Sequence, residues 1–281
     1  EYQRGRKDSA IRLLKRETAV DNTLFATRYA SALMAYQARD YANALRVGMS
    51  LAASFPASAR AAWLVARIHY DKQTDLDLYV SHLQVAMTDK GSDTIRAQAV
   101  HLYGLALFRS GKYEEAVTNF SAAADIRNDA VARYNQAVAL LALGRATESL
   151  VPLAQAAALD PKAHQVVLLQ ARAELIRKNY TAASQLVVSA RELAGDADLD
   201  SAALEGLIAL WLQQYPEALG ALKRATLRHP GVIEYWTNLA VAALYSDDVL
   251  TALSALEAAY KLQPRTELQS AIARLKTVVV R

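Results

Sequence analysis

Small residues recur along this sequence at intervals close to 34, in pairs whose members lie twelve positions apart. In six of seven successive stretches the first member is Ala32, Gly104, Ala137, Ala171, Gly206 or Ala240. The second member is Ala44, Ala116, Ser149, Ala183, Ala218 or Ala252. Two antiparallel helices can approach to about 8 Å only where small side chains face each other. The spacing therefore predicts a series of paired helices.

Larger apolar residues and prolines complete the period. Leu140, Leu222 and Leu256 lie three or four positions from small residues on the same predicted faces, so they supply an apolar stripe between neighbouring units. Proline closes four stretches, at Pro56, Pro161, Pro230 and Pro264. The residue before a proline avoids the α-helical region, so these prolines predict helix ends. The resulting repeats span residues 25–58, 60–93, 97–129, 130–163, 164–197, 199–232 and 233–266.

The motifs inside these repeats resemble those of the tetratricopeptide repeat family. Residues 97–129 contain Gly104, Tyr113, Ala116 and Phe120 at family spacing, and residues 233–266 contain Trp236, Leu239, Ala240, Ala252 and Pro264. The resemblance covers nearly the whole chain. It implies an all-α, right-handed superhelical solenoid of about seven helix-turn-helix repeats in a single domain, residues 1–281.

Flanking helices are expected at both ends. Residues 267–281 carry Leu268, Ile272 and Leu275 on one stripe, which is typical of a C-terminal capping helix. Residues 1–24 are interpreted as half of a repeat, or alternatively as a separate cap. In either case residues 8–19 are predicted to form a helix packed on the first helix of residues 25–58.

The second repeat departs from the pattern. Arg67 and Tyr79 occupy its two small positions, and an extra loop near residues 90–93 replaces the closing proline. Two bulky side chains do not fit a close helix crossing, so we expect the two helices to splay or shift.

The family resemblance implies that partners bind to the concave face formed by the first helices. The residues at its face positions are Tyr29, Leu33, Tyr36, His101, Phe108, Tyr134, Asn135, Arg172, Trp211, Asn238 and Tyr245. Relatives that grip acidic tails use Lys, Arg and Asn here, whereas this face is mostly apolar. It favours an amphipathic helix or an extended segment with Leu and aromatic anchors. The alternative is that many of these side chains belong to the core.

We hypothesise that one partner segment runs from about residue 134 to residue 245. Tyr134, Trp211 and Tyr245 would provide its aromatic anchors. Asn135 and Asn238 would hydrogen-bond its backbone.

Residues that could support catalysis or metal binding are sparse. Cysteine is absent, and the five histidines occur singly without an HExxH pair. No phosphate-binding glycine loop or nucleophile elbow occurs. Glu174 lies within one helical turn of Arg172 and Arg177, which favours a structural ion pair over a perturbed catalytic carboxylate. The sequence predicts no enzyme activity, no cofactor and no metal.

The charge distribution argues against nucleic acid as a partner. The net charge of +4 lies within residues 1–16, and the remaining 265 residues carry 26 basic and 26 acidic side chains. A nucleic-acid reader needs basic or base-reading residues on its working face. No stretch has the roughly 18 apolar residues of a membrane span, so direct membrane insertion is not expected.

Two function classes remain. The first is a protein-interaction scaffold that holds a protein or peptide partner. The second is the substrate-binding or regulatory arm of a larger enzyme, such as a peptidase or a glycosyltransferase. The preference for Arg over Lys and the high Ala content look bacterial, which suggests assembly of an envelope machine such as a pilus, a secretion channel or a polysaccharide exporter. The periplasm or envelope is then the expected location, with the cytoplasm as the alternative. The sequence identifies neither the partner nor the oligomeric state.

Overall fold

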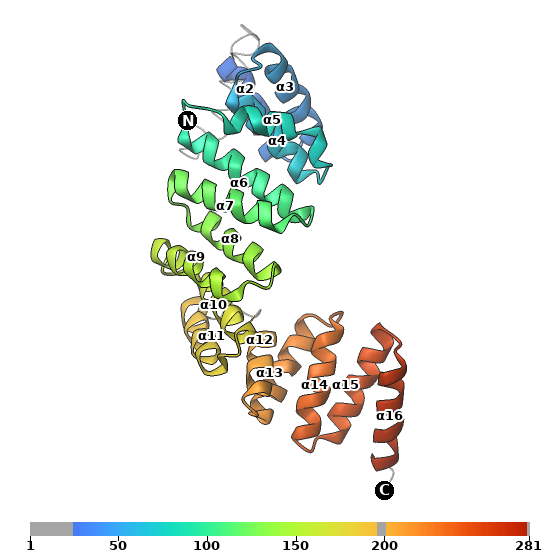
Figure 1. Ribbon diagram of the computed structural model, residues 1–281. Helices are drawn as coiled ribbons and strands as arrows, with labels where there is room; N and C mark the ends of the chain where they lie inside the picture. The colour runs from blue at the N-terminus through green and yellow to red at the C-terminus, as the bar shows by residue number, and fades with distance from the viewer. Residues whose placement is uncertain (1–24, 196–200, 280–281) are drawn as a thin grey trace. The chain divides into compact units, whose positions relative to one another are not determined.

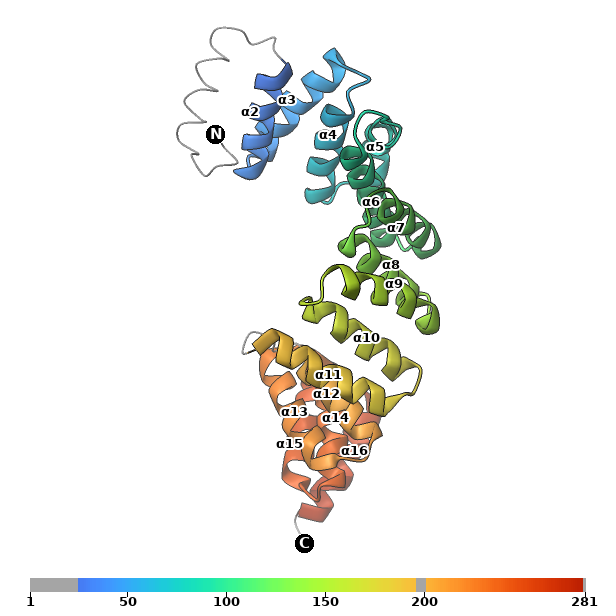
Figure 2. The ribbon, with the colours of Figure 1, turned by 90° about the vertical axis from the view of Figure 1, so that its left-hand side faces the viewer.

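The computed structural model describes residues 25–195 and 201–279 of the chain. Within these ranges the protein consists of helices and turns without a strand (Figures 1 and 2). The predicted all-α repeat fold is therefore confirmed. The chain divides into two compact units, residues 1–143 and 144–281, and each unit has its own hydrophobic clusters. The helix predicted for residues 8–19 lies outside the described residues.

The helices of the first unit follow one another as antiparallel neighbours (Figure 1). They are α2 (Phe25–Gln37), α3 (Tyr41–Ser54), α4 (Ala59–Asp71), the short 3-10 helix η2 (Leu76–Leu78), α5 (Val80–Met87), α6 (Asp93–Arg109), α7 (Tyr113–Arg127) and α8 (Ala130–Ala142).

The second unit contains eight further helices in its described part. They are α9 (Ala146–Leu159), α10 (His164–Ile176), α11 (Tyr180–Ala194), α12 (Ala202–Trp211), α13 (Tyr215–Arg228), α14 (Ile233–Tyr245), α15 (Val249–Leu262) and α16 (Thr266–Val279). In α3, α9, α13 and α15 the last residue lies two positions before a proline, as the closing prolines predict.

The small residues lie at the helix crossings. Ala32 and Ala44 are fully buried between α2 and α3, and Ala171 and Ala183 are fully buried between α10 and α11. Gly206 shows how close the approach is, because a Cβ atom placed on it would lie 2.5 Å from Cγ of Leu222. No side chain larger than hydrogen fits there unless Leu222 shifts.

Each first helix ends in the same turn. One residue of the turn has φ between 56° and 75°, at Arg39, Gln73, Gly111, Gly144, Lys178, Gln213 and Asp247. In the turns after α2 and α10, the next backbone N–H donates to the carbonyl five residues earlier, from Asp40 to Ala35 and from Asn179 to Glu174. This is the Schellman closure, whose left-handed residue is usually glycine. Five of these seven positions hold a residue with a Cβ atom, where the left-handed conformation is less favourable.

The second repeat differs from the sequence-based expectation. Helix α4 begins at Ala59, which places Ala66 rather than Arg67 at the buried crossing. Ala66 packs in a cluster with Tyr79 and Leu83, and the ring of Tyr79 is fully buried just before α5 begins. The guanidinium group of Arg67 instead lies partly exposed beside Asp71. The expectation of two bulky residues at this crossing is therefore half wrong, because Tyr79 enters the core and Arg67 does not.

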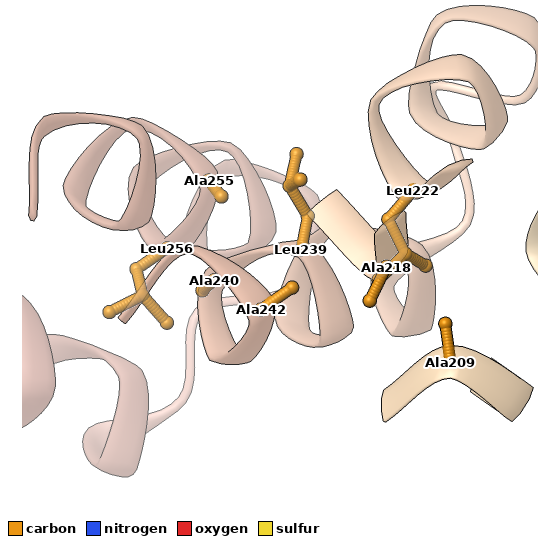
Figure 3. Packing of buried hydrophobic residues seen from close by; sticks show 8 residues of the cluster. All are labelled: Ala209, Ala218, Leu222, Leu239, Ala240, Ala242, Ala255 and Leu256. Carbon is orange, nitrogen blue, oxygen red and sulfur yellow. The ribbon is translucent and has the colours of Figure 1, made fainter. Parts of the chain in front are cut away.

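Helix α16 covers the last repeat of the second unit. Its residues Leu268, Ile272 and Leu275 pack against a buried cluster that α12, α13, α14 and α15 share. Figure 3 shows this cluster, in which Ala209 of α12 lies opposite Ala218 and Leu222 of α13. The apolar stripe of α16 thus covers a face that would otherwise be open to water.

Two glycines in neighbouring helices should respond in opposite ways to alanine. Gly206→Ala should lower the free energy of unfolding by about 1–3 kcal/mol, because its methyl group overlaps Leu222. Gly220→Ala in α13 should raise it by about 0.5–1 kcal/mol, because the nearest atom to the new Cβ is 4.0 Å away and alanine favours the helix. Urea unfolding of both variants measures the difference, and equal effects would contradict the close crossing.

Candidate functional site

The predicted site residues of the first unit are half-buried and partly engaged in packing. Tyr29, Leu33 and Tyr36 of α2 lie against a cluster that includes Ala32 and Leu64. Phe108 of α6 packs beside Tyr113 at a ring-centroid distance of 5.1 Å, and Tyr134 of α8 is half-buried. These rings contribute to the core as well as to the surface.

Tyr36 also takes part in a polar network that joins α2 to α4. Its hydroxyl donates to Oδ2 of Asp71 at 2.5 Å and accepts from Nε of Arg67 at 3.1 Å. Burial and the hydrogen bond to Asp71 raise the pKa of the Tyr36 hydroxyl. The hydroxyl therefore stays protonated and ties two repeats together.

His101 and Asn135 form a polar contact between α6 and α8. The side-chain nitrogen of Asn135 donates to Nε2 of His101 at 2.8 Å, and the His101 ring lies 5.4 Å from the ring of Phe120. Burial lowers the pKa of His101, which favours the neutral ring that accepts this hydrogen bond. Part of the hydrogen-bonding capacity predicted for a partner is thus used inside the repeat stack.

The predicted aromatic residues of the second unit are exposed. Trp211 is 62% exposed and Tyr245 is 65% exposed, and they end α12 and α14, the first helices of consecutive repeats. The Trp211 ring stacks on Tyr180 at 5.3 Å with planes 3° apart. The Tyr245 ring stacks on Tyr215 at 4.6 Å with planes 12° apart. Each exposed ring is held from one side by the tyrosine that begins the second helix of the preceding repeat.

Further side chains of the predicted face and exposed apolar residues lie on the first helices α10 and α14. Arg172 is exposed and Asn238 is half-buried. Ile176, at the end of α10, and Val241 and Leu244, on α14, are exposed apolar residues. We use the name aromatic face for the surface of the second unit that consists of Arg172, Ile176, Trp211, Asn238, Val241, Leu244 and Tyr245.

Sequence reasoning overlooked the supporting tyrosines. Tyr180 and Tyr215 stack on the two exposed rings, yet the predicted site included only Trp211 and Tyr245. A signal was present, because Tyr41, Tyr113, Tyr180 and Tyr215 each begin the second helix of a repeat.

Glu174 forms the predicted structural ion pair. Its carboxylate accepts from Nη1 of Arg177 at 2.7 Å and from the side chain of Asn179 at 2.6 Å. Among the described residues, no group of three or more His, Cys, Asp or Glu side chains could hold a metal ion. No helix in the described ranges is long and apolar enough to cross a membrane.

The paired helices and their shared turn define a helix-turn-helix repeat protein. Residues 101–164 and 203–267 match the family model described as tetratricopeptide repeat. These two stretches of the chain are tetratricopeptide repeats. A search of curated proteins found no match.

Several solved structures share the fold. The type IV pilus biogenesis factor PilW is 19% identical, with a TM-score of 0.65, and the match covers 77% of this chain and 99% of PilW. PilF of Pseudomonas aeruginosa is 18% identical, with a TM-score of 0.63, and the match covers 75% of this chain and 94% of PilF. A chain of the APC/C hetero-tetramer Cut9-Hcn1 is 14% identical, with a TM-score of 0.65. That match covers 98% of this chain, which spans 54% of the APC/C chain.

The buried histidine should make stability depend on pH. The pKa of His101 in the folded protein lies below its ordinary value near 6.5, so the unfolded chain binds more protons as the pH falls through about 6.5. The free energy of unfolding that neutral His101 contributes above this pH is therefore lost as the pH falls below it. The melting temperature should fall between pH 7.5 and pH 5.5, and His101→Gln should reduce the fall. Burial also lowers the pKa of His69 and His82, so part of the dependence should remain. Identical pH profiles for His101→Gln and the wild type would contradict this account.

Proposed function

We propose that the protein is a scaffold whose aromatic face binds a segment of a partner protein. The observation that carries the proposal is the pair of exposed rings, Trp211 and Tyr245, at equivalent positions of consecutive repeats. Large aromatic side chains are costly to expose, and rings that become buried in an interface contribute a large share of its binding energy.

The stacked arrangement prepares these rings for binding. Tyr180 and Tyr215 restrict the rotation of Trp211 and Tyr245, so little side-chain entropy is left to lose when a partner covers the outer ring faces. Ile176, Val241 and Leu244 extend the apolar surface around the rings. The surface suits a segment with Leu or aromatic side chains, either an amphipathic helix or an extended strand.

Polar side chains on the aromatic face would orient the bound segment. Arg172 is exposed and can pair with a carboxylate, and Asn238 can donate and accept hydrogen bonds with a peptide backbone. In the first unit, Tyr36 and Phe108 also lie near the ends of first helices, whereas Tyr134 lies in the first half of α8. We assign them a smaller contribution because they are half-buried.

Removing the two rings should abolish binding without unfolding the protein. A displayed peptide library selected on the purified protein provides a probe, whose affinity is then measured by calorimetry. Each ring should contribute about 2 kcal/mol, so Trp211→Ala with Tyr245→Ala should weaken the selected peptide by roughly a thousandfold. The helical signal and the melting temperature should change little, because both rings are exposed.

Leu250→Ala is the matched control, since Leu250 is equally exposed but lies on the second helix α15. It should leave the affinity unchanged. If none of the selected peptides binds the double variant more weakly than the wild type, the aromatic face is excluded. Loss of the helical signal in the double variant would instead assign the rings to the core.

The narrower part of the proposal is a role in assembling a bacterial envelope machine. It is supported by the 22 Arg against 10 Lys in the sequence and by the structural similarity to PilW, a type IV pilus biogenesis factor. The competing possibility is an arm of a larger enzyme that presents substrates to it.

Cross-linking in the cell should separate these two possibilities. A photoreactive amino acid at position 211 should capture a component of a pilus, a secretion channel or a polysaccharide exporter. Capture of an enzyme's substrate, or of a catalytic domain, would favour the competing possibility. Mass spectrometry of the cross-linked product makes the distinction.

A further inference from the structure

A second surface lies between the second helices of the same unit. The walls of this groove are α11 and α13, and its floor is α12. It consists of two hollows of about 420 Å³ each, one on either side of a bridge made by Arg191, Glu205 and Arg224. We call it the arginine groove. Trp211 and Tyr245 line neither hollow, so this surface is distinct from the aromatic face.

The bridge holds two arginines on a single carboxylate. Glu205 rises from the floor with its side chain only 15% exposed, and Ser201 donates to its Oε1 atom at 2.9 Å. Nη2 of Arg224 lies 2.7 Å from Oε2, and Nε of Arg191 lies 3.5 Å from Oε1. Both arginine side chains are about half exposed, and each guanidinium group has more N–H donors than the shared carboxylate engages. At the bridge two guanidinium groups therefore share one carboxylate, which leaves a local excess of one positive charge, while Glu217 lines one hollow and Arg228 lines the other.

Each hollow of the arginine groove contains an exposed apolar side chain beside polar and charged ones. Leu227, which is 83% exposed, lines one hollow, and the exposed Val188 lines the other. From Glu217 to Arg228, α13 runs along the groove for about 16 Å. An extended chain covers that distance with about five residues.

Gly220 lines the groove on α13 without a side chain that would project into it. It lies within α13, where glycine disfavours the helix. Gly104 and Gly206 have a packing reason, because a Cβ atom on them would overlap a neighbouring side chain. A Cβ atom on Gly220 would meet only the flexible end of Arg224, at 4.0 Å. The packing of the chain therefore does not account for Gly220, whereas an open groove does.

We infer that the arginine groove binds an extended acidic segment of a partner protein. A carboxylate of that segment pairs with Arg191 and Arg224, and aliphatic side chains on either side of it fill the hollows against Val188 and Leu227. The excess positive charge at the bridge selects the carboxylate, and the exposed Val188 and Leu227 distinguish a protein segment from a simple anion. The inference does not depend on the aromatic face.

The probes are fluorescently labelled, capped pentapeptides with a central Glu between aliphatic residues, and their analogues with Gln. The Glu peptides should bind the wild-type protein at least about tenfold more tightly than the Gln analogues, and rising salt should weaken them. Fluorescence anisotropy measures both effects. No binding by the Glu peptides, or equal binding by the Gln analogues, would overturn the inference.

Substitutions in and beside the arginine groove then test whether the peptides bind there. Gly220→Leu should fill the groove and weaken the Glu peptides at least tenfold, whereas Gly220→Ala should leave them bound. Arg191→Gln with Arg224→Gln should also weaken them. If this double variant does not fold, Gly220→Leu still tests the inference. Ser189→Leu, on an exposed part of α11 that lines neither hollow, is the matched control and should bind normally.

Two further outcomes would overturn the inference. One is binding that survives Gly220→Leu. The other is binding to phosphatidylglycerol vesicles that Gly220→Leu abolishes while the Glu peptides do not bind, which would make the groove a lipid site. Trp211→Ala with Tyr245→Ala should leave peptide binding to the arginine groove unchanged. A failure of the arginine-groove inference can therefore be distinguished from a failure of the aromatic-face proposal.

Discussion

The close approach of paired helices over small side chains is the constraint on which the rest of the structure depends. At Gly206 the neighbouring Leu222 occupies the space that any Cβ atom would need. Because one side of each helix packs in such a crossing, the larger apolar residues of that helix pack against the adjacent repeats. The remaining faces are then available to solvent, and both proposed binding surfaces lie on them.

Much of this architecture could be predicted from the sequence, because its causes are local. A small residue every 34 positions and a proline after a second helix are visible in the chain itself. The second repeat was harder, because Ala66 and Arg67 are adjacent and only tertiary packing shows which one is buried. The left-handed turn residues were also hidden, since only Gly111 and Gly144 carry the residue type that marks this conformation.

The sites could be predicted less completely, because exposure depends on neighbours from other repeats. Tyr36 and Tyr245 occupy similar places at the ends of first helices. Tyr36 is held by Asp71 of the next repeat, whereas Tyr245 is covered on one side by Tyr215 and is otherwise exposed. Sequence position assigns a side chain to a helix face, but it does not reveal what covers that face. For the same reason, the convergence of Arg191 and Arg224 on Glu205 becomes visible only when three helices are placed together.

The common turn after every first helix also governs how such a chain can change in length. The left-handed residues recur after 33 to 38 positions, and the longest interval, from Gln73 to Gly111, contains the short helix α5 and the loop before α6. Extra residues are therefore accommodated between repeats, whereas the turn inside a repeat keeps its hydrogen bonds only at a fixed spacing. Insertions and deletions in this chain should be tolerated in the loops between repeats, or as whole repeats. Inserting or deleting one residue inside the shared turn should disrupt the pair of helices that the turn connects.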